Sequence, residues 1–236
     1  MSRPKIIAFD FCGTLAELYP ETNDVLCKFI RKTYQTELSN DNAAQAIDHV
    51  SKITPYYSSV KILEESQKLE YYVDFNSKVL KKLGYEPNKS YELYEFFCDQ
   101  ERHWKIKPMV PTLMNTLKKM GYDLIIASNF DEHLEKLLTR NKIINNFSNL
   151  YISAIIGLEK PSEDFYKFII NSLSCQPEDI VMVGDSLDLD IYPSTAIGMQ
   201  GIFLNEKKFS EKIILQAPSI QYITISELTE LTSVLS

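Results

Sequence analysis

Short apolar runs alternate with longer amphipathic stretches at the start of the chain and again beyond residue 106. The apolar runs are Ile6–Phe9, Leu124–Ala127, Tyr151–Ile156, Ile180–Val183 and Gly201–Leu204. Each is nearly all apolar and ends in a polar or glycine-containing turn, which is typical of strands buried on both faces. The intervening stretches predict crossover helices at residues 111–120, 131–142, 162–173 and 191–197. This alternation predicts a Rossmann-like, doubly wound α/β fold with a mainly parallel sheet.

Residues 17–106 have a different pattern, with no convincing strand and a single glycine, Gly84. Apolar residues recur there at helical spacing, in the stretches Thr22–Gln35, Asp41–Ile53, Val60–Leu83 and Ser90–Trp104. Asp41 and Ser90 are expected to be helix N-caps. The sequence therefore predicts an all-helical domain, residues 17–106, inserted into an α/β core formed by residues 1–16 and 107–236. Within 218–236 we expect an edge strand near Tyr222–Ile225 and a short helix.

Composition narrows the classes of partner. Hydrophobic residues make up 44% of the chain and charged residues 24%, an ordinary globular mixture. The net charge of −7 argues against nucleic-acid binding, which depends on clustered Lys and Arg. It still permits an anionic substrate, because a metal ion and a few cations can hold one phosphate locally.

The chain carries no sign of membrane insertion or secretion. Its apolar runs fall short of the about 18 residues that a membrane span needs, and the first is too short for a signal peptide. The four cysteines, Cys12, Cys27, Cys98 and Cys175, form no Cys-x-x-Cys pair. Free thiols in a reducing cytoplasm are the expected state. The sequence gives no indication of oligomeric state.

Chemically capable residues follow four of the predicted strands. In an open parallel sheet, ligands bind beyond the carboxyl ends of the strands. The residues in question are Asp10 after the first strand, Ser128 and Asn129 after the second, Lys160 in the loop after the third, and Asp185 with Asp190 after the fourth. The fold should bring them to one edge of the sheet.

These residue types suit phosphoryl transfer. A carboxylate can attack phosphorus and form an aspartyl-phosphate, which divides one hard displacement into two easier ones. Mg²⁺, held by one or two carboxylates, would neutralise charge on the acid and on the phosphoryl group. The hydroxyl of Ser128 and the ammonium group of Lys160 could hold phosphoryl oxygens. Gly13 and Gly184 would let the backbone turn sharply beside the site.

Four segments together resemble the motifs of the haloacid dehalogenase-like hydrolase superfamily. They are Asp10-Phe11-Cys12-Gly13-Thr14-Leu15, Ser128-Asn129, Lys160-Pro161 and Gly184-Asp185-Ser186 with Asp190 beyond. Each alone would also fit a helix cap, a turn or a solvated lysine, but their order and placement favour the superfamily. The helical insert is similar to that family's first-type cap, which selects the substrate.

The resemblance implies a role for each motif residue. Asp10 would be the nucleophile and a Mg²⁺ ligand, with the Cys12 backbone carbonyl and Asp185 as further ligands. Asp190 would bind the metal through water or orient other groups. Ser128 and Lys160 would bind the phosphoryl group, and Thr14 and Asn129 would contribute to substrate binding.

Cys12 departs from the family pattern. Most phosphatases of the superfamily have a second aspartate there, which protonates the leaving group and later activates water. A thiol with a pKa of about 8.5 can donate a proton but is a poor base towards water. The backbone carbonyl is unaffected by the side chain, so metal binding should survive the substitution.

Three functions remain open from the sequence. The first is a Mg²⁺-dependent phosphatase acting on a small phosphorylated metabolite, or on a phosphoprotein, with altered acid–base chemistry. The second is a carbon–halogen hydrolase, whose halide leaves without a proton; such enzymes usually have an aromatic residue at the Cys12 position and lack the acidic fourth motif. The third is a binding or regulatory protein without turnover. Candidate substrate-selecting residues in the insert are Glu17, Arg31, His49, Tyr56, Tyr57 and Lys61.

Overall fold

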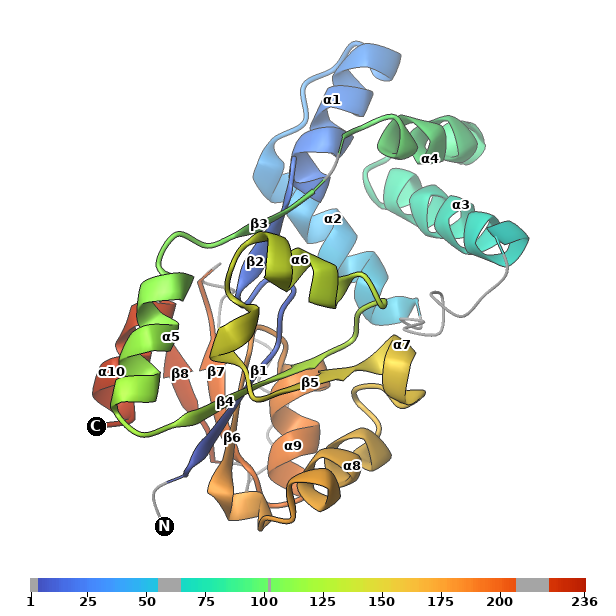
Figure 1. Ribbon diagram of the computed structural model, residues 1–236. Coiled ribbons are helices and arrows are strands. Elements are labelled where there is room, and N and C mark those ends of the chain that lie inside the picture. Colours follow the sequence, from blue (N-terminus) through green and yellow to red (C-terminus); the bar gives the residue numbers. More distant parts are fainter. Residues whose placement is uncertain (1–3, 55–64, 102, 207–220) are drawn as a thin grey trace. The chain divides into compact units, whose positions relative to one another are not determined.

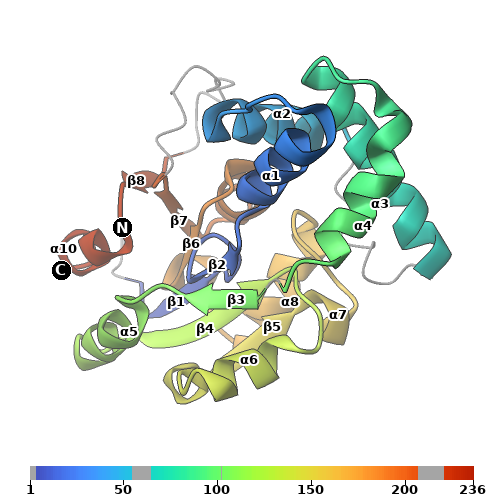
Figure 2. The same cartoon turned by 90° about the horizontal axis from the view of Figure 1, so that it is seen from above.

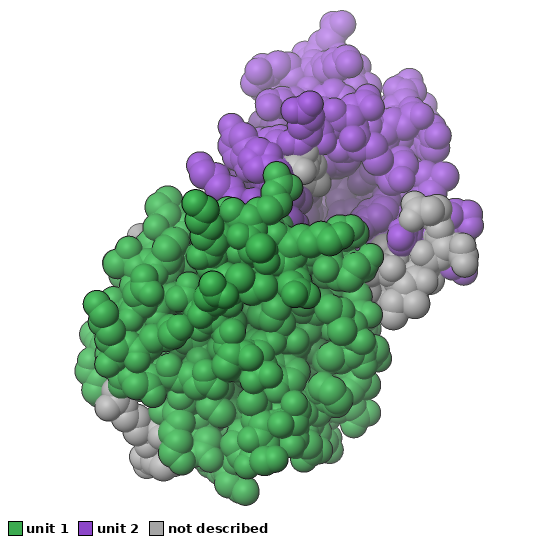
Figure 3. All heavy atoms as spheres, in the orientation of Figure 1, with its two compact units in different colours: residues 1–17, 106–236 green, residues 18–105 purple. Residues whose placement is uncertain are grey.

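A computed structural model describes residues 4–54, 65–101, 103–206 and 221–236. Three of the substrate-selecting candidates, Tyr56, Tyr57 and Lys61, therefore lie outside the described residues. The chain divides into two compact units (Figure 3): residues 1–17 with 106–236, here the core unit, and residues 18–105, here the helical unit.

The core unit is built on a six-stranded sheet in which every neighbouring pair is parallel, which confirms the predicted α/β class (Figure 1). Its strands, in spatial order, are β5 (Asn149–Ile152), β4 (Asp123–Ser128), β1 (Ile6–Phe9), β6 (Ile180–Gly184), β7 (Gln200–Leu204) and β8 (Ile223–Ile225). At the end of β1, Phe9 is in register with Ile126 of β4 and Val183 of β6. The residues that follow these three strands therefore emerge side by side at one edge.

Helices cover both faces of this sheet, as Figure 1 shows for α5 and α10 on one side and α8 and α9 on the other. The core-unit helices are α5 (Val110–Lys119), α6 (Leu134–Arg140), α7 (Ser153–Ile156), α8 (Glu163–Leu173), α9 (Tyr192–Ala196) and α10 (Leu231–Val234). Phe165, Tyr166 and Ile169 of α8 pack in one buried cluster with Ala8 and Met182 of the central strands. Burial on both faces explains why these strands are almost wholly apolar.

The described residues of the helical unit form four α-helices, labelled in Figure 2: α1 (Thr22–Tyr34), α2 (Asn40–Ile53), α3 (Glu65–Lys82) and α4 (Ser90–Cys98). Their apolar stripes form one buried cluster, which includes Leu26, Ile30, Val50, Leu80 and Leu93. Two predicted caps are wrong. Ser39, whose hydroxyl accepts a hydrogen bond from the Asn42 N–H at 3.2 Å, caps α2 in place of Asp41. Ser90 is the first residue of α4 and does not cap it.

Two four-residue strands correct the prediction that residues 17–106 hold no strand. β2 (Ala16–Tyr19) and β3 (His103–Ile106) form a two-stranded sheet, so the helix predicted up to Trp104 ends at Cys98. Each strand is too short for its own pattern to show, and its partner lies far along the chain.

A further correction concerns the apolar run 151–156. The strand stops at Ile152, and residues 153–156 form α7, which ends at Gly157 in a left-handed conformation with φ 71°. An apolar run of this length does not by itself distinguish a buried strand from a buried helix.

The remaining helical turns are short. Three-residue 3-10 turns occupy 87–89, 144–146, 177–179 and 228–230, and a single π turn, η5, spans Leu187–Ile191. Among the described residues, no helix is both long and apolar enough to span a bilayer. No disulfide joins the four cysteines in the described residues.

Candidate active site

Asp10 lies directly beyond β1, and its backbone N–H continues the ladder to β6 through a 2.9 Å hydrogen bond to the Val183 carbonyl. The residue is only 5% exposed. Its Oδ1 accepts hydrogen bonds from the Ser128 hydroxyl at 3.2 Å and from the Lys160 ammonium group at 2.7 Å. The fold thus joins residues from three predicted motifs at one carboxylate.

Lys160 is the centre of the buried charge network. Its ammonium group donates to Oδ1 of Asp190 at 2.6 Å as well as to Asp10, and the residue is 2% exposed. The Asn129 side-chain amide bonds the Lys160 backbone at both ends, donating to its carbonyl at 2.8 Å and accepting from its N–H at 2.9 Å. Asn129, predicted to bind substrate, therefore has a visible structural task, which is to position Lys160.

Asp190 is held by the π turn that follows β6. Its Oδ2 accepts a 3.1 Å hydrogen bond from the Ser186 N–H, while the Ser186 hydroxyl accepts from the Leu189 N–H. The buried Tyr166 hydroxyl donates to the Leu189 carbonyl and fixes the turn from the α8 side. Single π turns occur frequently at functional sites, where the wider turn redirects a side chain. Both carboxylate oxygens of Asp190 therefore have hydrogen-bond partners, Oδ1 in the Lys160 ammonium group and Oδ2 in the Ser186 N–H.

Two glycines allow the carboxylates to approach the backbone. A Cβ added at Gly13, whose φ is +78°, would lie 2.1 Å from Oδ2 of Asp185. A Cβ added at Gly184 would lie 2.3 Å from Cγ of Asp190. Any larger residue at either position would displace a site carboxylate, so the reason for both glycines is close contact, with a left-handed backbone in addition at Gly13.

Burial and neighbouring charge set the protonation of this network. Burial raises the pKa of Asp190 to about 6; Lys160 opposes the shift and Asp10 adds to it. For Lys160, burial lowers the pKa, but the carboxylates of Asp10 and Asp190 outweigh it and hold the pKa above its ordinary value. Lys160 is therefore a permanent cation at neutral pH. Burial also raises the pKa of Tyr166, so its hydroxyl remains a donor.

The acidic side chains fit a hard divalent cation. One carboxylate oxygen from each of Asp10, Asp185 and Asp190 lies within 4.8 Å of the other two. Asp185 is the most exposed of the three, which suits an ion that keeps some of its water. The cluster holds three carboxylates, and Lys160 pairs with two of them, Asp10 and Asp190, so a divalent ion would offset the remaining negative charge.

Cys12 and Thr14 are predicted site residues in the loop after Asp10. Cys12 is half-buried and forms an isolated β-bridge with Ala16. Thr14 is fully buried, and its hydroxyl has no hydrogen-bond partner among the described residues. The structure therefore does not link the Thr14 hydroxyl to the Asp10–Lys160–Asp190 network.

Three residues near the site were missed by the sequence reasoning. Tyr166 lies on α8, Lys107 directly follows β3, and Glu206 lies just beyond β7. The rule of inspecting the residues after each strand would have found Glu206, because β7 is a fifth parallel strand with its carboxyl end at the same edge. The rule does not find Tyr166 or Lys107, because neither residue follows a strand of the six-stranded sheet: Tyr166 lies within helix α8 and Lys107 follows β3 of the two-stranded sheet.

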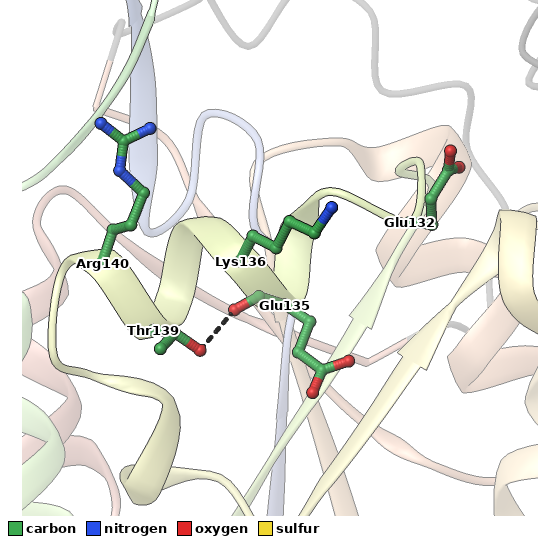
Figure 4. Close-up of a pocket in the computed structure, with 5 residues that line it drawn as sticks. All are labelled: Glu132, Glu135, Lys136, Thr139 and Arg140. Carbon is green, nitrogen blue, oxygen red and sulfur yellow. Dashed lines mark hydrogen bonds between the residues drawn. The ribbon is translucent and has the colours of Figure 1, made fainter.

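A separate shallow hollow lies on α6, outside this network (Figure 4). Its lining residues are Glu132, Glu135, Lys136, Thr139 and Arg140. All five are exposed, and the one hydrogen bond drawn among them joins the Thr139 hydroxyl to the Glu135 carbonyl within the helix. With no buried polar group, the hollow has the character of a solvated helix face.

Comparisons with known proteins show what the chain is similar to. A protein-family model described as haloacid dehalogenase-like hydrolase matches residues 4–196. A glyceraldehyde 3-phosphate phosphatase from Pyrococcus furiosus is 26% identical over 241 residues, covering 100% of this chain and 94% of its own.

Solved structures with the same fold include proteins described as phosphatases and proteins described as dehalogenases. A hydrolase of this family from Bacillus subtilis, bound to magnesium, has a TM-score of 0.67 at 20% identity and covers 100% of both chains. An L-2-haloacid dehalogenase has a TM-score of 0.66 at 14% identity and covers 99% of both chains. At these identities the likeness establishes the fold alone, so the reaction must be inferred from the residues of the site.

Proposed function

The chain belongs to the haloacid dehalogenase-like hydrolase family, and from that premise we propose that it is a Mg²⁺-dependent phosphomonoester hydrolase with Asp10 as its nucleophile. One observation carries the proposal: buried Asp10 shares Lys160 with Asp190, and Asp185 completes an acidic cluster beside them. That arrangement combines a nucleophile, a fixed cation and an oxygen-rich metal site. The similarity to a Pyrococcus furiosus phosphatase over the whole chain supports the same reaction.

In the first step, a carboxylate oxygen of Asp10 attacks phosphorus and the bond from phosphorus to the ester oxygen breaks. Lys160 and Ser128 both reach Oδ1, which favours Oδ2 as the attacking atom. As the aspartyl-phosphate forms, the same ammonium and hydroxyl groups are placed to hold the phosphoryl oxygens. Bound Mg²⁺, held by Asp10, Asp185 and the Cys12 carbonyl, would neutralise charge on the phosphoryl group.

In the second step, water attacks phosphorus, releases inorganic phosphate and restores the Asp10 carboxylate. The alcohol leaving in the first step needs a proton, and the water must lose one. In this proposal the Cys12 thiol gives its proton to the leaving alcohol and the resulting thiolate regains one from solvent. Of the two protons of the attacking water, one stays on the released phosphate and the other passes to solvent, because a thiol is a weak base for water at neutral pH. Slow hydrolysis of the aspartyl-phosphate is the expected consequence.

Carbon–halogen hydrolysis is a second candidate, favoured by one specific observation, the absence of a carboxylate at Cys12. In that reaction Asp10 attacks carbon, and halide leaves with its electron pair and no proton. The acidic pair Asp185 and Asp190 has no evident task in that chemistry, which places this candidate second.

Within the proposed reaction, a small phosphorylated metabolite is the expected substrate class, and a phosphoprotein is the alternative. We propose that the helical unit, residues 18–105, acts as the substrate-selecting cap. Arg31 is paired with Glu37 at 2.8 Å, and His49 and Glu17 are exposed, so the described geometry singles out none of these three candidates.

A paired assay tests the proposal. The purified chain is given p-nitrophenyl phosphate with Mg²⁺ or with EDTA, and separately chloroacetate with halide detection. Phosphate release that depends on Mg²⁺ is the expected result. Halide release without metal would transfer the assignment to the second candidate, and no turnover of either substrate would leave a binding role.

A further inference from the structure

A second buried cation lies beside the site loop. The Lys107 side chain is 6% exposed, and its ammonium group donates to the Gly13 carbonyl at 2.7 Å and to Oε2 of Glu206 at 2.5 Å. The three residues come from the loop after β1, the segment after β3 and the end of β7. The contact therefore ties together three parts of the core unit that are remote in sequence.

The burial of Lys107 distinguishes this pair from surface ion pairs. Exposed pairs contribute little, whereas a buried charge is tolerated only when it is paired and hydrogen-bonded. Lys107 is additionally fixed through its backbone, because its N–H donates to the Leu15 carbonyl at 3.0 Å and its carbonyl accepts from the Val110 N–H at 3.0 Å. The ammonium group is thus delivered from a rigid backbone.

Gly13, the residue that receives this hydrogen bond, is restrained on its other sides as well. Its N–H donates to the Ala16 carbonyl at 2.8 Å, and its Cα faces the Asp185 carboxylate so closely that no Cβ would fit. The Gly13 carbonyl belongs to the Gly13–Thr14 peptide, which is joined through the Gly13 Cα to the peptide that carries the Cys12 carbonyl. Rotation of the Gly13–Thr14 peptide would therefore disturb that neighbouring peptide and the Cα against which the Asp185 carboxylate lies. The Cys12 carbonyl and the Asp185 carboxylate are both metal ligands in the proposed function.

We propose that Lys107 and Glu206 are positioning residues. They fix the Gly13 carbonyl and so hold the neighbouring Cys12 carbonyl and the Asp185 carboxylate in place for binding Mg²⁺. Lys107 supplies the hydrogen bond, and Glu206 holds the ammonium group over the Gly13 carbonyl. The catalytic meaning of this inference rests on the proposed function, but the loop geometry can be tested without it. Outer-shell partners of this kind typically change metal affinity or activity by about 10–100-fold.

The test compares Lys107→Met and Glu206→Gln with a matched control, Lys167→Met, which removes the exposed ion pair to Glu163 on α8. Amide hydrogen exchange of residues 10–16 reports loop order in the metal-free chain. Titration calorimetry with MgCl₂ gives the Mg²⁺ dissociation constant, and p-nitrophenyl phosphate turnover gives kcat and the apparent KM for Mg²⁺.

Lys107→Met should accelerate exchange in residues 10–16 and leave the β6 amides at their wild-type rates. It should also weaken Mg²⁺ binding by about 10–100-fold, chiefly as a higher apparent KM for Mg²⁺. Glu206→Gln, which keeps the side-chain size and the Lys107–Gly13 bond, should act in the same direction but more weakly. Lys167→Met should change neither quantity.

Unchanged exchange in residues 10–16, or an equal rise in exchange throughout the core unit, would overturn the inference. If Lys107→Met does not fold, Glu206→Gln decides by the same measurements. A wild-type chain that releases no phosphate with Mg²⁺ would refute the proposed function alone, since the exchange comparison still decides whether Lys107 orders the loop.

Discussion

The ammonium group of Lys160 lies 2.7 Å from Oδ1 of Asp10, although 150 positions separate the two residues in sequence. The same group also reaches Asp190 at 2.6 Å. One buried cation therefore balances two carboxylates, that of the proposed nucleophile Asp10 and that of Asp190.

Asp10→Asn should lower turnover of p-nitrophenyl phosphate by more than about 10³-fold, because an amide cannot form the aspartyl-phosphate. The substitution is nearly isosteric, so the folded state should persist in circular dichroism. Asp164→Asn, at an exposed carboxylate of α8, is the control and should keep wild-type activity. Substantial turnover by Asp10→Asn would remove Asp10 from the nucleophile role.

Cys12→Asp should raise activity selectively on alkyl phosphates, whose leaving alcohols have a high pKa and need a proton. The gain should approach the about 10²–10⁴-fold typical of a positioned acid–base group, and it should be smaller on p-nitrophenyl phosphate. Cys12→Ser, which changes the atom without adding an acid, serves as the control. Equal effects of both variants on both substrates would show that another group already transfers the proton.

Lys160→Met should make the stability of the fold depend strongly on Mg²⁺. Removing the ammonium group leaves two buried carboxylates facing each other, at an expected cost of about 3–5 kcal/mol in the metal-free chain. Mg²⁺ bound to the folded state should recover part of that loss. Urea unfolding in EDTA and in MgCl₂ measures this, with exposed Lys136→Met as control; a Mg²⁺ response no larger than that of wild type would contradict it.

Asp190 should make the free energy of unfolding of the metal-free chain depend on pH. Its pKa is raised by burial to about 6 in the folded state, against about 4 when unfolded. Between these values the folded state binds more protons than the unfolded state. The contribution of Asp190 to the unfolding free energy is therefore largest below about pH 4 and is lost as the pH rises through 6.

Urea unfolding of wild type and Asp190→Asn in EDTA, from pH 4 to pH 8, tests that sign. The stability of wild type relative to the variant should fall between about pH 4 and 6 and stay level above. Lys160 and Asp10 face this carboxyl group, so the comparison is made with both intact. Parallel curves for the two proteins would refute the raised pKa.

Gly184→Ala should damage activity more than its small size suggests. The added methyl group would lie 2.3 Å from Cγ of Asp190, so this carboxylate must move. A misplacement of about 1 Å can cost about 10²-fold in rate. Gly157→Ala is the contrast, because its Cβ meets nothing within 4 Å and only its φ of +71° is strained. That variant should lose stability but keep its kcat; similar kcat values for the two would argue against the steric account.

Local patterns in the sequence were sufficient to predict the α/β class and the positions at which the buried strands end. β1 was predicted to the residue, because an apolar run between polar turns is a local signal that needs no partner. The same signal located Asp10, Ser128, Lys160 and Asp190, since chemistry follows parallel strands at their carboxyl ends. It did not identify β2 and β3, whose four-residue strands depend on pairing across a long stretch of chain.

Only the tertiary structure shows which polar residues of the site hold other residues in position. Asn129 bonds the Lys160 backbone, Tyr166 holds the π turn, and Lys107 reaches Gly13 from the boundary between the predicted insert and the core. These are contacts between side chains and remote backbone atoms, and their partners depend on how strands and helices pack. The sequence determined which residues could do chemistry, because strand ends are a local property; packing determined which of them support the others.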